Sequence, residues 1–173
     1  DSSTSRGLGD VYKRQPLQEG AWPTMAASAI PYSKNNPVPK EMDRQDMDLV
    51  REQFVAATLK AEKAGFDMIE LHCAHGYLLN TFLSPKTNKR SDEYGGSIEN
   101  RLRYPVEIFK AIRQIWPETK PISVRISATD WVEGGVEMND ILYTAKTFKS
   151  LGCDILDVSS GQVVSDENPE YGR

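Results

Sequence analysis

Hydrophobic residues recur along the chain in two periods, one typical of amphipathic helices and the other of strands. A stripe at helical spacing after Asp46 predicts a helix capped by that residue, and Gly65 is placed to end it. The stripe consists of Val50, Phe54, Ala57, Ala61 and Ala64. Residues 66–72 then alternate between apolar and polar positions and are predicted to form a strand.

The same succession of helix and strand is predicted twice more. After a long loop over residues 73–96, Ser97 opens a helix that runs to about Trp116, and residues 121–127 form the second strand. The apolar stripe of this helix is Ile98, Leu102, Phe109, Ile112 and Trp116. A third helix, with Asn139 as its cap and the stripe Ile141, Ala145 and Phe148, is closed by Gly152 and leads into a strand over residues 153–159. Residues 16–45 contain five prolines and are predicted to be a loop.

The two faces of each predicted strand differ. One face is apolar, whereas the other becomes polar toward the carboxyl end, with Glu70 and His72, then Ser123, Arg125 and Ser127, then Asp157 and Ser159. A doubly wound sheet, with helices on both faces, would have almost continuously apolar strands, and it remains the alternative. We therefore predict an α/β chain that forms part of a (β/α)8 TIM barrel. A closed barrel needs about 250 residues, so residues 16–173 are expected to be a central fragment.

Composition narrows the class of protein. The chain has 173 residues, of which 27% are charged, and its net charge of −4 argues against a nucleic-acid partner. Since no apolar run reaches about 18 residues, no membrane span is expected. Cys73 and Cys153 are too few for a disulfide framework and are expected to be reduced thiols, which fits a cytoplasmic location. Residues 1–15 show no apolar period, so we expect a disordered leader or a junction introduced by cloning, with a native polar tail as the alternative.

His72, His75 and Tyr77 are candidates for catalysis because they lie at the end of the first strand and in the loop behind it. Two imidazoles three residues apart can donate to one oxygen, and a nearby phenol can supply a proton. A structural role for each residue is the competing interpretation. A metal site with His72, Cys73 and His75 as ligands and Cys153 as a fourth is a further alternative. On a strand, however, Cys73 should point away from His72, so no metal is predicted.

Residues 66–104, FDMIELHCAHGYLLNTFLSPKTNKRSDEYGGSIENRLRY, closely resemble the old yellow enzyme family of FMN-dependent oxidoreductases. The similarity extends to SVRISATDW at 123–131, LDVSSG at 156–161 and ASAIPY at 27–32. Within the family, segments such as WPTMAASAIPY and ISATDWVEGG look closest to the reductase half of bifunctional anthraniloyl-CoA monooxygenases and salicylyl-CoA 5-hydroxylases. There, a flavin hydroxylase domain would be fused to the barrel.

The resemblance implies a role for each candidate residue. The three strands would be the fourth, fifth and sixth of the barrel, and the cofactors would be FMN and NAD(P)H. His72 and His75 would hold the oxygen of an unsaturated carbonyl compound or CoA thioester, and Tyr77 would donate a proton. Arg125 would contact the pyrimidine side of FMN, with Glu70 or the reduced flavin as its charge partner. The family's phosphate site lies on other strands, so a non-catalytic fragment is the rival interpretation.

Residues 84–101, the later part of this loop and the start of the next helix, are expected to be structural. Arg90, Asp92, Glu93 and Arg101 are predicted to form a charged network that fixes it, with Ser97 as the helix cap.

Overall fold

The computed structural model describes residues 23–167, so the predictions for residues 1–15 lie outside the described part. The elements, in chain order, are β1 (Met25–Ala26), β2 (Lys40–Glu41), α1 (Arg44–Lys63), β3 (Ile69–Cys73), α2 (Leu78–Leu83), α3 (Ile98–Ile115), β4 (Ile122–Ser127), α4 (Met138–Ser150) and β5 (Ile155–Ser159). The three predicted strands and the three predicted helices are all present. β1, β2 and α2 lie in segments that the sequence predicted to be loops.

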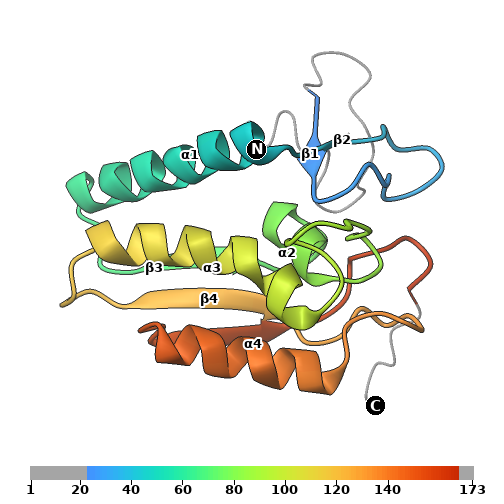
Figure 1. Ribbon diagram of the computed structural model, residues 1–173. Helices are drawn as coiled ribbons and strands as arrows, with labels where there is room; N and C mark the ends of the chain where they lie inside the picture. The colour runs from blue at the N-terminus through green and yellow to red at the C-terminus, as the bar shows by residue number, and fades with distance from the viewer. Residues whose placement is uncertain (1–22, 168–173) are drawn as a thin grey trace, which may run out of the picture.

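The main sheet is parallel and has the order β3-β4-β5. Strands that follow one another along the chain are therefore neighbours in the sheet, each joined to the next by a helical crossover. The crossover helices α3 and α4 lie on one side of the sheet, with α1 beside α3 (Figure 1). Helices on a single side of consecutive parallel strands are what a section of a barrel requires, and this confirms the predicted fold class.

The core lies between this sheet and the helices. From the strands it takes the fully buried side chains of Leu71, Ile122, Val124 and Ile126, which share the face predicted to be apolar. From the helices it takes Leu102, Phe109, Ile112 and Phe148, as predicted, and Trp116 just beyond α3. The rings of Phe109 and Phe148 pack edge to face, with centroids 5.3 Å apart, and so join α3 to α4.

Helix α1 begins earlier than the sequence predicted. Its N-cap is Asp43, which accepts a hydrogen bond from the Asp46 N–H, while the Asp46 side chain accepts from the Asp43 N–H. Asp46 is therefore the third residue of a capping box and not the cap. The predicted apolar stripe was also too wide, because Ala57 and Ala64 are exposed. Thr58 is buried instead, and its hydroxyl donates to the Phe54 carbonyl at 2.9 Å, which satisfies it inside the helix.

Two other predictions are corrected. Asn139 is not the cap of α4, since the helix already includes Met138 and its N-cap is Glu137. Residues 73–96 are not all loop, because residues 78–83 form α2. The five residues of α2 from Leu79 to Leu83 are all buried. A short helix that is buried on every side has no apolar period, and the pattern therefore could not reveal it.

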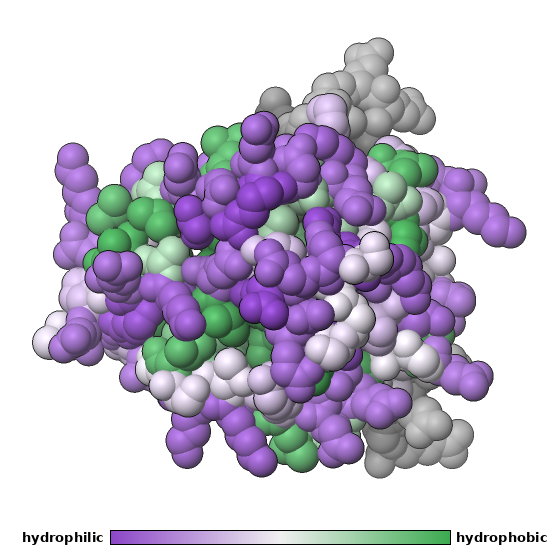
Figure 2. All heavy atoms as spheres, in the orientation of Figure 1, coloured by the Kyte–Doolittle hydropathy of each residue, from purple (hydrophilic) through white to green (hydrophobic). Residues whose placement is uncertain are grey.

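The outer surface is not uniformly polar. The view onto the helices shows mainly hydrophilic residues, interrupted by hydrophobic groups (Figure 2). Val158 of β5 shares the face of Leu156, yet 57% of it is exposed. Within residues 23–167 the strand pairs with β4 alone. The apolar pattern of β5 was predicted correctly, whereas its burial is incomplete.

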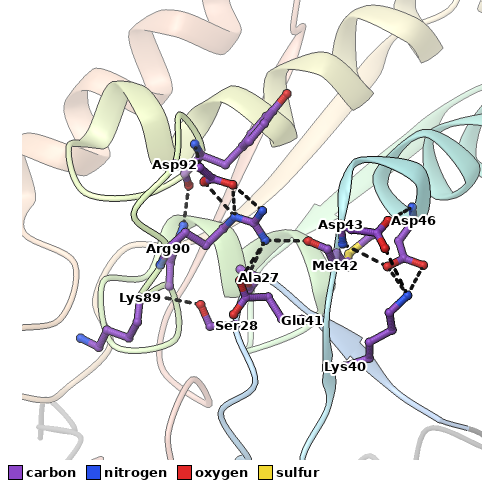
Figure 3. A network of polar contacts seen from close by, with 12 residues as sticks. Ala27, Ser28, Lys40, Glu41, Met42, Asp43, Asp46, Lys89, Arg90 and Asp92 are labelled. Atoms are coloured by element: carbon purple, nitrogen blue, oxygen red, sulfur yellow. Dashed lines mark hydrogen bonds and ion pairs between the residues drawn. The ribbon is translucent and has the colours of Figure 1, made fainter.

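Arg90 anchors the β1–β2 segment to the loop that follows α2 (Figure 3). Its Nη1 donates to the main-chain carbonyls of Ala27, at 3.0 Å, and Met42, at 2.7 Å. Its guanidinium also pairs with Asp92, and 8% of the side chain is exposed. The predicted charged network therefore exists around Arg90 and Asp92. Arg101, in contrast, is not part of it.

Arg101 instead links the loop to α4. Its guanidinium pairs with Asp140 at 2.7 Å and donates to the Leu83 carbonyl. Glu93 contributes its main-chain carbonyl, which accepts a hydrogen bond from Arg103 Nε. The helix cap Ser97 was predicted correctly, because its side chain accepts from the Asn100 N–H. The loop is thus held by two separate arginines.

We predict that Arg90→Ala lowers the free energy of unfolding by about 2 kcal/mol or more. A buried guanidinium that serves two main-chain carbonyls leaves both without a donor when it is removed. Urea titration would measure the effect, with Arg103→Ala as the control, because Arg103 is exposed and should cost less. Equal losses in the two variants would contradict an anchoring role for Arg90.

Candidate active site

A row of polar side chains crosses the three parallel strands. The register pairs His72 of β3 with Arg125 of β4, and Arg125 with Asp157 of β5. Residues at paired positions point to the same side of a sheet, and this side is opposite to the face that packs on the helices. The row lies near the carboxyl ends of the strands, where the loops that follow β3, β4 and β5 also meet. The predicted site residues on the strands are thus brought together.

Arg125 occupies the middle of this row. Its Nη1 donates to Asp157 Oδ2 at 3.0 Å, and Nη2 reaches Ser159 Oγ at 3.5 Å. The prediction that Glu70 could be its charge partner is wrong, because the register sets Glu70 opposite Ser123, whose hydroxyl donates to Glu70 at 2.7 Å. The Nε of Arg125 is buried and has no acceptor among residues 23–167. The buried Nε is therefore left as a donor for a further partner.

Two further aromatic rings lie beside His72 of this row. The ring centroids of His72 and His75 are 5.8 Å apart, with an interplanar angle of 60°. Those of His72 and Tyr77 are 5.1 Å apart. His72 comes from β3, His75 from the turn after it, and Tyr77 is the N-cap residue of α2. The predicted catalytic residues are therefore neighbours in space, and together they place imidazole and phenol groups at the carboxyl ends of the strands.

The electrostatic setting favours a neutral His72. Burial lowers the pKa of its imidazole below the usual value, and the nearby His75 and Arg125 lower it further. Glu70 and Asp157 act in the opposite direction but do not outweigh these effects. A neutral imidazole can donate one N–H to a substrate oxygen without adding a positive charge beside Arg125.

Sequence reasoning missed several residues that support this site. Asp157 and Ser159 were recognised as polar positions, but their contacts with Arg125 depend on a register that the sequence does not reveal. Asp130 was also missed. It is fully buried, accepts from Ser84 Oγ at 2.6 Å and from the Val136 N–H at 3.0 Å, and so ties the loop after β4 to the end of α2. Burial raises the pKa of this carboxyl group.

A metal centre finds no support in residues 23–167, where no group of three or more His, Cys, Asp and Glu residues could hold an ion. Cys73 is buried on the helix side of β3, away from His72, and burial raises the pKa of its thiol. Both cysteines are free thiols. In the same residues no helix has the length and apolarity that crossing a membrane would need.

The chain is similar to known proteins along most of its length. A family described as "NADH:flavin oxidoreductase / NADH oxidase family" matches residues 6–171. An NADPH dehydrogenase of Geobacillus thermodenitrificans is 47% identical over 140 residues, which are 81% of this chain and 41% of that protein. An NADPH dehydrogenase of Halalkalibacterium halodurans is 48% identical over 149 residues, or 86% of this chain and 43% of that protein. The chain thus spans about two fifths of the length of these relatives.

Solved structures of similar fold include two reductases. A 2-naphthoyl-CoA reductase in complex with 2-naphthoyl-CoA has a TM-score of 0.74 and 30% identity, over 80% of this chain and 21% of the other. Morphinone reductase in complex with tetrahydroNAD has a TM-score of 0.70 and 27% identity, over 79% of this chain and 42% of the other. The match covers part of each of these structures, in agreement with a section of a barrel.

The lowered pKa of His72 predicts a pH dependence of stability. When the pH falls below about 6.5, the unfolded chain binds a proton at this residue before the folded chain does, so stability is lost. The free energy of unfolding should therefore decrease more for the wild type than for His72→Gln between about pH 7.5 and about pH 5.5. Urea titrations at the two pH values would test this. An identical decrease in both proteins would show that His72 is not perturbed.

Proposed function

The chain belongs to the NADH:flavin oxidoreductase / NADH oxidase family, and we propose that within a whole barrel it supplies the substrate-facing side of an FMN-dependent active site. The reaction would be the transfer of hydride from NAD(P)H to an activated C=C bond, for which bound FMN would supply the redox chemistry. The observation that carries this proposal is the row His72–Arg125–Asp157 at the carboxyl ends of parallel strands, with the rings of His75 and Tyr77 beside His72.

Arg125 fits the cofactor. Its buried Nε has no acceptor within residues 23–167, while Asp157 already occupies another edge of the guanidinium. A heterocycle rich in carbonyl and nitrogen acceptors, such as the pyrimidine side of a flavin, would satisfy that donor and would benefit from the positive charge. When bound, FMN supplies the hydride chemistry that no side chain of the protein can perform. Arg125 is therefore assigned to holding FMN.

His72 and His75 are assigned to holding the substrate's oxygen. Their rings lie 5.8 Å apart at an angle, so N–H groups from both can converge on one atom. Hydrogen bonds aimed at a carbonyl oxygen stabilise the negative charge that develops there as hydride reaches the β-carbon. Because its pKa is lowered, His72 performs this as a neutral donor at pH 7.

Tyr77 is assigned to proton delivery. Its ring lies 5.1 Å from that of His72, on the side from which α2 begins. A phenol is a weak acid that holds its proton at neutral pH and can release it to a carbon that gains negative charge. The proton then goes to the carbon next to the carbonyl, which completes the reduction of the C=C bond.

The substrate is proposed to be an unsaturated carbonyl compound or a CoA thioester. In support, the structurally similar 2-naphthoyl-CoA reductase is described in complex with 2-naphthoyl-CoA. A flavin hydroxylase domain fused to the barrel stays a prediction from sequence resemblance, as does a cytoplasmic location. We also propose that the chain alone is inactive, because in residues 23–167 β3 and β5 each pair on one side only. An open edge leaves main-chain groups unpaired, and the site lacks the neighbouring strands that would enclose it.

Tyr77→Phe should separate the two halves of the reaction in the whole protein. The change keeps the ring and removes the hydroxyl, so reduction of the flavin by NADPH should proceed at nearly the normal rate. Reoxidation by 2-cyclohexen-1-one should slow by about 10² to 10⁴-fold, the usual contribution of a general acid. Stopped-flow absorbance of the flavin would time the two steps separately.

Tyr143→Phe is the matched control, since Tyr143 lies exposed on α4, away from the strand ends. Equal slowing of both steps by Tyr77→Phe would mean that Tyr77 positions the flavin. If neither step slows, the Tyr77 hydroxyl takes no part in the reaction and its proposed role is refuted.

A further inference from the structure

We propose that Ser127 and Asn80 are positioning residues that lock the turn His75–Gly76 in a left-handed conformation and so fix the His75 imidazole beside His72. This inference rests on the proposed function for the role of His75. It adds two residues outside the catalytic set, from two different elements, and assigns them a task that can be measured without turnover.

The turn has an unusual backbone. His75 has a φ of 59° and Gly76 a φ of 69°, so two successive residues lie in the left-handed region. Glycine adopts this conformation readily, whereas a residue with a side chain does so at a cost. The turn's own main-chain hydrogen bond, from the Tyr77 N–H to the Ala74 carbonyl at 3.2 Å, offsets part of this cost. Further contacts that hold the N–H groups of His75 and Gly76 would fix the conformation.

Two hydrogen bonds meet this requirement. The His75 N–H donates to Ser127 Oγ at 2.9 Å, and the Gly76 N–H donates to Asn80 Oδ1 at 2.7 Å. In the left-handed conformation these two consecutive N–H groups each reach a side-chain acceptor. A relaxed turn would separate at least one N–H from its acceptor and leave a buried polar group unpaired.

Both acceptors are rigidly placed. Ser127 is the last residue of β4 and 2% exposed, and its hydroxyl donates in turn to the Gly161 carbonyl at 3.4 Å. Asn80 is 1% exposed within α2. The turn is therefore fixed from the end of one strand and from a buried helix. Through Gly161, the same serine connects the loop after β3 to the loop after β5.

This arrangement determines how the rings meet. His75 is the residue whose backbone Ser127 binds, and Tyr77 follows Gly76 directly as the N-cap of α2. A change in the turn would move the His75 ring away from His72 and alter the approach of Tyr77 as well. The hydrogen bonds of Ser127 and Asn80 go to main-chain N–H groups of the turn, so we assign them a role that acts through His75 and not a catalytic one.

The experiment uses the fact that the whole chain contains two histidines. Selective ¹⁵N and ¹³C labelling of histidine gives an NMR spectrum with two imidazoles and two backbone amides, which His72→Gln assigns. We would compare the wild type with Ser127→Ala and Asn80→Ala. Ser84→Ala is the control, because it removes a fully buried serine hydroxyl that binds Asp130 rather than the turn.

Ser127→Ala and Asn80→Ala should each shift the His75 signals and make its amide exchange with solvent about tenfold faster or more. The pKa of His72 should rise part of the way toward its usual value, since burial, the main cause of its lowering, stays along with Arg125, Glu70 and Asp157, while His75, which also lowers it, moves away. Ser127→Thr, which keeps the hydroxyl, should restore the wild-type spectrum. The control should lose stability without these changes.

The inference is overturned if Ser127→Ala and Asn80→Ala leave the His75 signals as in the control, or if Ser127→Thr fails to restore them. Should Ser127→Ala not fold, Asn80→Ala decides alone, because Asn80 holds Gly76 from a different element. Neither flavin nor substrate enters the measurement. The two experiments can disagree. If the NMR signals of His75 respond as expected but Tyr77→Phe shows no kinetic defect, the inference stands and the proposed function is refuted.

Discussion

The parallel register of three strands is the constraint on which the site depends. It sets His72 opposite Arg125 and Arg125 opposite Asp157, so that an imidazole, a guanidinium and a carboxylate stand in one row. A shift of one residue would turn each of these side chains toward the helices and would place apolar residues on the face that now carries the polar row. The core prevents such a shift, because Leu71, Val124 and Ile126 are buried on the opposite face.

Much of the fold could be predicted from local patterns. Alternation in residues 121–127 identified β4 and the face that Val124 and Ile126 bury, and the stripe through Leu102, Phe109 and Ile112 identified α3. Details decided by side-chain hydrogen bonds could not be predicted in the same way. Asp43 caps α1 because Asp43 and Asp46 each accept a hydrogen bond from the other's main-chain N–H. The short helix α2 is stabilised by burial of nearly all its side chains and has no single apolar face that a pattern could reveal.

For the site, the sequence identified the chemical groups but not their partners. His72, His75, Tyr77 and Arg125 could be named from strand ends and from resemblance to a family. The choice of Asp157 over Glu70 as the partner of Arg125 follows from register, which depends on the packing of the whole sheet. The left-handed turn at His75 was equally hidden, since its anchor Ser127 is 52 residues away along the chain.

The central claim is that this polar row faces a flavin, and the midpoint potential of FMN in the whole protein tests it most directly. Arg125→Gln removes a positive charge and leaves Asp157 unneutralised, so the potential should become more negative. Asp157→Asn leaves Arg125 unneutralised, so the potential should become more positive. Arg103→Gln, on the exposed surface, should leave it unchanged. Spectroelectrochemical titration would measure all three. Opposite shifts are the predicted result, and potentials that stay at the wild-type value in both variants would contradict the account.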